Sequence, residues 1–427
     1  MKLESMVLHH AYKSDPTTKA AAVPIYQTTS YTFDDTQHGA DLFDLKVAGN
    51  IYTRIMNPTT AVLEERMAAL EGGIGALCVA SGMAAITYAV EAITHVGANI
   101  ISTSQLYGGT YNLFAHTLPR QGVEVRMASF DDLDTLDALF DENTKAVFCE
   151  SIGNPAGNVV DLQALSKIAH KHGVPLIVDN TVATPALIRP FEHGADIVIH
   201  SLTKYVGGHG TTIGGVIVDS GKFDWVANKD RFPMLNEPDP SYHGVVYTEA
   251  LGPAAYIGRC RVVPLRNTGA ALSPQNAFQL LQGLETLPLR MERHCQNAQA
   301  LAEYLSAHPL VSWVNYAGLD NSPYHATCQK MSGGLASGII SFGIKADDAK
   351  VAGGKFIDAL QMILRLVNIG DAKSLACHPA STTHRQLSPE ELASAGVSED
   401  LVRISVGIEH IDDIIADVEQ ALKASLA

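Results

Sequence analysis

A lysine at residue 204 stands where a solvated side chain is not expected. Residues 196–210 read DIVIHSLTKYVGGHG, so Lys204 follows an apolar run that is typical of a buried strand, whereas lysine usually lies at the surface. Ser201 and Thr203 are two positions apart, so in an extended chain their hydroxyls point to one side and Lys204 points to the other. The glycines that follow let the backbone approach a ligand closely. This combination predicts a ligand site.

A second candidate for ligand binding is the segment CVASGMAA, in which Ser81, Gly82 and Met83 separate a predicted strand from a predicted helix. The backbone N–H groups at a helix N-terminus, together with a serine hydroxyl, form an anion site. An ordinary serine N-cap with a turn glycine explains the same letters, so the segment alone leaves both interpretations open.

Polar residues also follow other apolar runs. Asp179 ends VPLIVD, and a buried carboxylate needs a cation or several donors, unless it only caps a turn. Glu150 and Asn154 follow a strand in VFCESIGNPAGN, where turn chemistry explains most of the pattern. Tyr107, in QLYGGTY, is either an ordinary half-buried aromatic or a ring that stacks on a planar ligand.

One ligand accounts for these groups together. Its phosphate would bind residues 81–83, Ser201 and Thr203, its basic ring nitrogen would pair with Asp179, and its carbonyl would react with Lys204. Pyridoxal 5'-phosphate meets all three demands, because its aldehyde forms a Schiff base with a desolvated lysine and its protonated ring accepts electrons.

The elements that position these residues alternate from about residue 61. Near-continuous apolar runs predict strands that are buried on both faces, and the runs between them, such as Met83–Ile93 and Asp161–His172, predict helices. The predicted strands are Ala76–Ala80, Asn99–Ser102, Val123–Ala128, Ala146–Glu150, Pro175–Asp179, Asp196–His200 and Gly214–Val218. This alternation predicts an α/β fold with a mostly parallel sheet covered by helices, in which ligands bind at the carboxyl ends of the strands.

The C-terminal part has a different pattern. Ser273 and Pro274 are typical of a helix N-cap and first turn, and Pro288 should kink or break that helix. The last predicted strand is Leu401–Val406, before an amphipathic helix near 410–424.

These patterns divide the chain into three parts. Residues 1–60 are polar and irregular and predict an extended arm, residues 61–287 a cofactor-binding domain, and residues 288–427 a smaller α+β domain. Residues 222–248 interrupt the strand–helix rhythm with three prolines and predict a long insertion.

Composition excludes several classes of function. The 427 residues carry a net charge of −15, which makes nucleic acid and anionic membranes poor partners. MKLESMVLHH lacks the apolar core of a signal peptide. Six scattered cysteines predict reduced, mostly buried thiols in a cytoplasmic protein, and 17 dispersed histidines give no metal site.

The run from 196 to 210 closely resembles the pyridoxal-phosphate lysine signature of the Cys/Met-metabolism enzymes. That family comprises cystathionine γ-synthases and lyases, methionine γ-lyases and O-acylhomoserine sulfhydrylases. Further blocks resemble the family's in the family's order, from residue 52 to 410: YTRIMNPT, VASGMAA, QLYGGT, ESIGNP, VDNTVATP, HPASTTH and VRISVGIEH. The resemblance implies the type I fold of pyridoxal-phosphate-dependent transferases, with a seven-stranded sheet and a smaller C-terminal domain.

The resemblance also implies roles for single residues. Lys204 would hold the cofactor and move protons between the substrate's carbons, Asp179 would pair with the ring nitrogen, and Tyr107 would stack on the ring. The phosphate would be held by Ser81, Gly82, Met83, Ser201 and Thr203.

Two further groups follow from the same resemblance. Tyr52 and Arg54 match the pair that the family lends to a neighbouring subunit's phosphate, so the active site would need at least a dimer, and a homotetramer built as a dimer of dimers is expected. Arg403 would bind the substrate's α-carboxylate with help from Asn154.

Within the family, three features favour the sulfhydrylase branch. Position 109 is Gly where methionine γ-lyases typically have Cys, the substrate-contacting position 368 is Asn where lyases and γ-synthases usually have Ser, and the 222–248 insertion resembles that of the longer sulfhydrylases. The expected reaction is a γ-replacement that converts O-acetyl-L-homoserine and sulfide to L-homocysteine and acetate, in methionine biosynthesis. Methionine γ-lyase or cystathionine γ-synthase activity on the same scaffold is the alternative. A non-enzymatic relative would have lost Lys204, Asp179 or Arg403, and all three are present.

Overall fold

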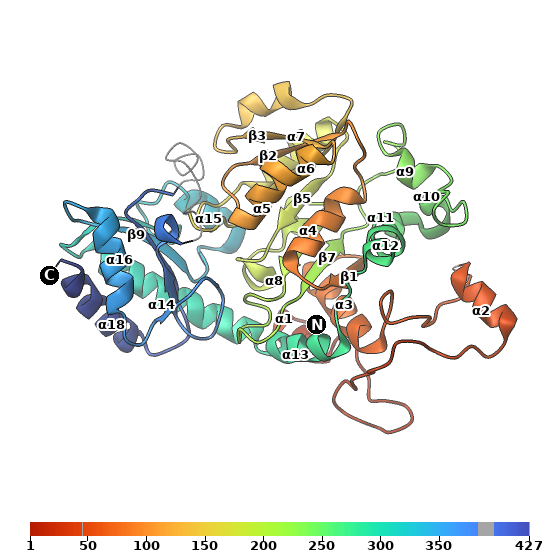
Figure 1. Ribbon diagram of the computed structural model, residues 1–427, viewed down its shortest axis with the longest axis horizontal. Helices are drawn as coiled ribbons and strands as arrows, with labels where there is room; N and C mark the ends of the chain where they lie inside the picture. The colour runs from red at the N-terminus through yellow and green to blue at the C-terminus, as the bar shows by residue number, and fades with distance from the viewer. Residues whose placement is uncertain (45, 383–396, 427) are drawn as a thin grey trace.

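The computed structural model describes residues 1–44, 46–382 and 397–426, and it contains two sheets (Figure 1). The larger sheet has seven strands in the order β1-β7-β6-β5-β4-β2-β3. Their bounds are β1 Gly75–Val79, β2 Asn99–Thr103, β3 Glu124–Ala128, β4 Thr144–Glu150, β5 Leu176–Asp179, β6 Ile197–Ser201 and β7 Gly215–Asp219. All seven strands predicted from the sequence are confirmed, with small shifts at their ends.

The larger sheet is mostly parallel, as predicted. Strands β3, β2, β4, β5 and β6 run parallel to one another, and β7 runs antiparallel between β6 and β1. The carboxyl ends of β4, β5 and β6 therefore meet at one edge, with Glu150 opposite Asp179 and Asp179 opposite Ile199. This edge is where ligands bind in sheets of this kind.

Both faces of the larger sheet are buried, which explains why its strands are apolar at successive positions. In β5, Ile177 enters one hydrophobic core and Val178 enters the other. Helix α4 (Gly82–Glu91) contributes Ile86 to the first core. Helices α3 (Pro58–Glu71), α7 (Leu162–Lys171) and α13 (Pro274–Glu285) contribute leucines to the second.

The smaller sheet lies in the C-terminal part of the chain, in the order β10-β11-β12-β9-β8. Its strands are β8 Val311–Asn315, β9 Ile339–Ile344, β10 Leu364–Arg365, β11 Leu375–Cys377 and β12 Leu401–Ser405. Helices α14 (Leu287–Ser306), α15 (His325–Ser332), α16 (Ala349–Ala359) and α18 (Ile411–Ser425) accompany it. Of the five strands, only β12 was predicted from the sequence.

The helix break predicted at Pro288 is present. Ser273 caps α13, its hydroxyl accepting a hydrogen bond from Asn276 N, and Pro274 is the first helical residue. Helix α13 ends at Glu285 and α14 starts at Leu287, with Pro288 in its first turn.

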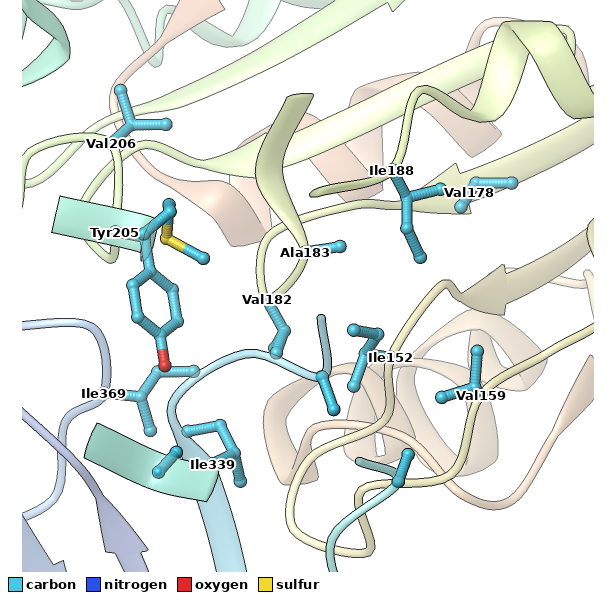
Figure 2. Close-up of a cluster of buried hydrophobic side chains, with 14 of the residues drawn as sticks. Ile152, Val159, Val178, Val182, Ala183, Ile188, Tyr205, Val206, Ile339 and Ile369 are labelled. Carbon is cyan, nitrogen blue, oxygen red and sulfur yellow. The ribbon is translucent and has the colours of Figure 1, made fainter. Parts of the chain in front are cut away.

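The two sheets share one hydrophobic core. Figure 2 shows Ile339 of β9 and Ile369 close to Tyr205 and Val182, which follow strands of the larger sheet. All four are buried in the same cluster. The carboxyl edge of the larger sheet is therefore packed directly against the smaller sheet's part of the chain.

The N-terminal arm corrects one expectation, because residues 1–60 are not irregular throughout. Helix α1 (Leu3–His9) buries Val7, and α2 (Thr36–Phe43) lies at the far right of Figure 1, on the arm. The 222–248 insertion forms the short helix α9 (Pro233–Asn236) and the start of α10 (Tyr247–Leu251). It contacts the arm, since the Tyr242 hydroxyl donates to Phe43 O at 3.3 Å.

Six cysteines are buried and unpaired, as the sequence predicts. Over the described ranges, no helix has both the length and the apolarity needed to cross a bilayer. Within the same ranges, no group of three His, Cys, Asp or Glu side chains is arranged to hold a metal ion.

Candidate active site

A cavity of about 230 Å³ lies at the carboxyl edge of the larger sheet, where the two sheets meet. Most of the site residues predicted from the sequence line it: Ser81, Gly82, Met83, Tyr107, Asn154, Asp179, Ser201, Thr203, Lys204, Asn368 and Arg403. Two do not. Tyr52 and Arg54 lie on the arm, exposed, with the guanidinium stacked 5.1 Å above the tyrosine ring.

One end of the cavity is built from the N-terminus of α4. The Ser81 hydroxyl accepts a hydrogen bond from Ala84 N at 3.1 Å, so the N-cap interpretation of this serine is confirmed. Gly82 has no room for a side chain, because a Cβ there would lie 2.6 Å from the Cβ of Ser201. The first N–H groups of a helix have no partner within the helix and attract anions. This end therefore suits a phosphate.

The loop after β6 adds hydroxyls to this end. Thr203 is held by the backbone of Gly214, donating to its carbonyl at 3.2 Å and accepting from its N–H at 3.1 Å. Ser201 N donates to the Thr181 hydroxyl at 2.7 Å. The loop that carries Lys204 is thus tied to both neighbouring strands.

Asp179 ends β5 and is buried in the floor of the cavity. Its carboxylate accepts a hydrogen bond from Thr181 N at 3.0 Å, and burial raises its pKa. In the described part of the chain no cation forms a salt bridge with it. A buried carboxylate without a cationic partner suits a protonated ring nitrogen.

Lys204 is partly buried and lacks a carboxylate partner among the described residues. Its Nζ donates to Asn368 Oδ1 at 2.5 Å. Burial, together with the positive charge of Arg403, lowers the pKa of Lys204 to about 8. A lysine in this state is partly neutral near physiological pH, so it can act as a nucleophile or as a base.

Arg403, in β12, faces the same cavity from the smaller sheet and is only 7% exposed. Its guanidinium donates to Asn154 Oδ1 and to Asn368 O, both at 3.1 Å. Its Nε is buried without a partner. A carboxylate bound here would satisfy that Nε and form the paired hydrogen bonds that arginine prefers.

Sequence reasoning missed several residues of the cavity. Thr181 and the apolar residues Ile152, Val182, Val367 and Ile369 line it, and nothing in their local sequence distinguishes them from ordinary core or loop residues. Glu150 also lines it. Its signal was present, since it ends a strand next to the strand of Asp179, but turn chemistry explained it equally well.

The residues of the cavity fit pyridoxal phosphate. The N-terminus of α4 and the hydroxyls of Ser201 and Thr203 suit the phosphate, the unpaired Asp179 suits the ring nitrogen, and the low-pKa Lys204 suits the aldehyde. Each of these features is a physical property of the site and does not depend on the resemblance.

Comparisons with known proteins agree with this fit. A family model described as Cys/Met metabolism PLP-dependent enzyme matches residues 4–423. The homocysteine synthase of Schizosaccharomyces pombe is 53% identical, with 99% of this chain and 98% of that protein covered. O-acetyl-L-homoserine sulfhydrylase 1 of Thermus thermophilus is 51% identical, with 99% and 100% covered.

A solved structure is also similar over almost its whole length. The crystal structure of a putative O-acetylhomoserine (thiol)-lyase from Campylobacter jejuni superposes with a TM-score of 0.96 at 45% identity, covering 99% of this chain and 100% of that one. That structure carries N'-pyridoxyl-lysine-5'-monophosphate.

Proposed function

Because the chain belongs to the Cys/Met-metabolism family of PLP-dependent enzymes, we propose that it converts O-acetyl-L-homoserine and sulfide to L-homocysteine and acetate by γ-replacement. One observation carries the proposal: a low-pKa lysine and a buried arginine with a free Nε line a single small cavity. Relatives at 45–53% identity are named for this chemistry.

These residues line the cavity and would hold the cofactor at three points. Asp179 would pair with the ring nitrogen, Tyr107 would stack on the ring, and Lys204 would bind the aldehyde. The phosphate would be held by Ser81, Gly82, Met83, Ser201 and Thr203. When bound, the cofactor supplies an electron sink that stabilises negative charge on the carbons next to the substrate's amine.

Lys204 moves the protons of the reaction. With its pKa at about 8, a large fraction of free Nζ is neutral near that pH and can accept a proton from the substrate's Cα. The hydrogen bond to Asn368 Oδ1 holds Nζ in place. We assign the removal of the proton at Cβ to Lys204 as well, and the loss of that proton allows acetate to leave from Cγ before sulfide adds there.

Arg403 and Asn154 orient the amino acid. Arg403 binds the α-carboxylate through its unpartnered Nε and its neighbouring N–H groups, and Asn154 Oδ1 holds the guanidinium in place. Because the guanidinium is buried, this charge pair is shielded from water and fixes the substrate's orientation.

The cavity walls favour an acetyl ester over a succinyl ester. Lys204 and Arg403 are the only cationic side chains among the described residues that line it, and both already have roles. Ile152, Val182 and Ile213 are typical of the remaining wall. A succinyl group would place a second carboxylate against apolar side chains without a partner, which is costly.

The arm supports a shared active site. Tyr52 and Arg54 are exposed and lie outside this chain's own cavity, which is the arrangement expected if they reach a neighbouring subunit's phosphate. We propose a homotetramer assembled as a dimer of dimers, with residues 1–60 as the arm, 61–287 as the cofactor-binding domain and 288–427 as the smaller domain. Six buried free thiols favour a reducing compartment such as the cytoplasm.

The assay that tests this function incubates the holoenzyme with O-acetyl-L-homoserine, with and without sulfide, and identifies the products by chromatography. Sulfide-dependent homocysteine supports the proposal. Formation of 2-oxobutyrate and ammonia without sulfide would identify a lyase, and cystathionine formed from added cysteine would identify a γ-synthase. O-succinyl-L-homoserine should react more slowly than the acetyl ester.

A further inference from the structure

Glu150 is a second buried carboxyl group in the cavity, and the reaction outlined above gives it no role. It is the last residue of β4, it is 5% exposed, and the strand register places it directly opposite Asp179 of β5. Two adjacent buried carboxyls repel each other when both are ionised. A neutral amide at this position would avoid that repulsion, so the presence of a carboxyl group has to be explained by an interaction that an amide cannot make.

Glu150 accepts two hydrogen bonds, one with each carboxylate oxygen. Oε1 accepts from Tyr107 N at 2.6 Å, and Oε2 accepts from Asn154 N at 3.2 Å. Tyr107 precedes the short helix α5 (Gly108–Asn112), after β2, whereas Asn154 lies in the loop after β4. One side chain thus connects two loops that line the cavity through different residues.

Both loops contact the reactants in the proposed function. Tyr107 would stack on the cofactor ring, and Asn154 Oδ1 accepts the hydrogen bond of Arg403 that orients the guanidinium for the substrate's carboxylate. A displacement of Glu150 would therefore move both Tyr107, which contacts the ring, and Asn154, which orients Arg403 for the substrate's carboxylate.

We propose that Glu150 is a positioning residue that holds the Tyr107 loop and the Asn154 loop in register, and so couples the cofactor ring's stacking partner to the substrate-carboxylate site. This inference rests on the proposed function. A carboxylate is required because both donors are backbone N–H groups, and only a group with two acceptor oxygens can satisfy both. Glutamine would present its NH₂ group to one of these donors.

The electrostatic surroundings that the chain itself provides favour the neutral acid form of Glu150 near pH 7. Burial, and then the charge of Asp179, raise the pKa of Glu150 to about 8, while the two backbone N–H groups oppose the rise. A positive ring nitrogen beside Asp179 would stabilise the carboxylate form of both groups. Loading the cofactor would therefore strengthen the hydrogen bonds that align the two loops.

The test compares Glu150→Gln with a matched control, Asp196→Asn, in the holoenzyme. Asp196 is also a buried carboxylate beside the same sheet, accepting from Leu176 N and paired with His170 at the opposite edge, away from the cavity. Both substitutions replace one oxygen of a buried carboxyl group with an NH₂ group, and thermal unfolding of each variant measures the accompanying loss of stability. Only Glu150→Gln should change the site.

Three readouts separate a positioning role from a structural one. In Glu150→Gln, the KM for O-acetyl-L-homoserine should rise roughly tenfold, because one hydrogen bond is lost and a donor is left unpaired, whereas the KM for sulfide should stay unchanged. The visible circular dichroism of the bound cofactor should change, since the Tyr107 loop shifts. Glu150→Asp keeps both acceptor oxygens on a shorter side chain, so it should change the KM for O-acetyl-L-homoserine and the circular dichroism less than Glu150→Gln does.

A binding measurement keeps this inference separate from the proposed reaction. L-2-aminobutyrate has an α-carboxylate but no leaving group, so its dissociation constant with the holoenzyme, measured by calorimetry, does not depend on which ester is the substrate. It should rise in Glu150→Gln and not in Asp196→Asn. Unchanged KM, dichroism and dissociation constant in the Glu150 variants, or equal changes in the control, would overturn the inference even if the sulfhydrylase reaction is confirmed.

Discussion

At the scale of single residues, the chemistry of the site depends on a lysine that is partly neutral. Burial and the charge of Arg403 lower the pKa of Lys204 to about 8, and its Nζ donates a hydrogen bond to the neutral amide of Asn368. A carboxylate in place of Asn368 would raise the pKa of this lysine and keep it protonated.

The lowered pKa of Lys204 predicts that the rate depends on pH. Below about pH 8 the free amine of Lys204 is increasingly protonated and cannot accept a proton, so kcat should fall roughly tenfold per pH unit and level off above pH 8. Steady-state rates over a range of buffers check this expectation. The pKa of Glu150 is also about 8, so Glu150→Gln serves as the control. Its kcat should show the same fall below pH 8. A flat profile across this range would contradict the role of Lys204.

A site residue could be predicted from the sequence only where packing or turn formation did not explain its presence equally well. Lys204 could be predicted because a lysine that follows a buried strand, with hydroxyls before it and glycines after it, has few structural explanations. Asp179 was less certain, because a turn cap explained it as well, and the hydrogen bond from Thr181 N shows that it does cap the turn. Arg403 needed the family resemblance, since an arginine in a strand is otherwise a surface charge. Glu150 could not be assigned, because its hydrogen bonds come from backbone N–H groups that the sequence does not place.

At the scale of elements, burial on both faces made the larger sheet predictable. Every strand from β4 to β7 is apolar at successive positions, which is a strong signal. Three strands of the smaller sheet gave weak signals, because β8 is only partly buried, β10 consists of two exposed residues and β11 has three residues. Strand β9 is buried throughout and was missed despite its apolar residues. Helices α1 and α2 have seven and eight residues, too few for a clear helical period.

The start of β4 gives a prediction about stability. Asp141, three residues before β4, accepts hydrogen bonds from Asn99 Nδ2 at 2.8 Å and from Arg126 at 2.7 Å, which tie the segment before β4 to β2 and β3. Burial opposes ionisation, but these donors outweigh it and lower the pKa of Asp141 to about 2.

Asp141→Asn should therefore destabilise the protein at neutral pH by about 1 kcal/mol, after allowance for solvent screening. The contribution of a carboxylate with a lowered pKa is complete above the unfolded value of about 4 and is lost as pH falls toward 2. Urea unfolding of both proteins at pH 7 and near pH 3 measures the difference, with exposed Asp347→Asn as control. A penalty that does not shrink at the lower pH would show that the ion pair is unimportant.

At the scale of the whole molecule, the cavity exists because two sheets share a core. Ile152, Val182 and Ile369 belong to that core and also line the cavity, so packing between the sheets places Arg403 opposite Lys204. The alternation of strands and helices predicted the larger sheet, and the ordered family blocks extended the prediction to the arm and the C-terminal part. The contact between the insertion and α2 could not be predicted, because it joins a side chain to a backbone carbonyl distant in sequence.

A shared active site predicts complementation between inactive variants. Lys204→Ala removes the proposed reacting amine, and Arg54→Ala removes the proposed phosphate contact of the arm, so each variant alone should have little activity. In a mixed dimer, one site receives Lys204 from one subunit and Arg54 from the other. Mixing the variants under conditions of subunit exchange should restore part of the wild-type activity. If the arm served its own chain, no mixed assembly would contain an intact site, and no activity would return.

The most direct test of the account asks which amine carries the cofactor. The purified protein is loaded with pyridoxal phosphate, reduced with borohydride, digested, and its peptides are sequenced by mass spectrometry. The account predicts a phosphopyridoxyl group on Lys204, in the peptide that contains HSLTK, and none in Lys204→Ala. A label on another lysine, such as Lys145 or Lys222, or no label at all on a folded protein, would contradict it.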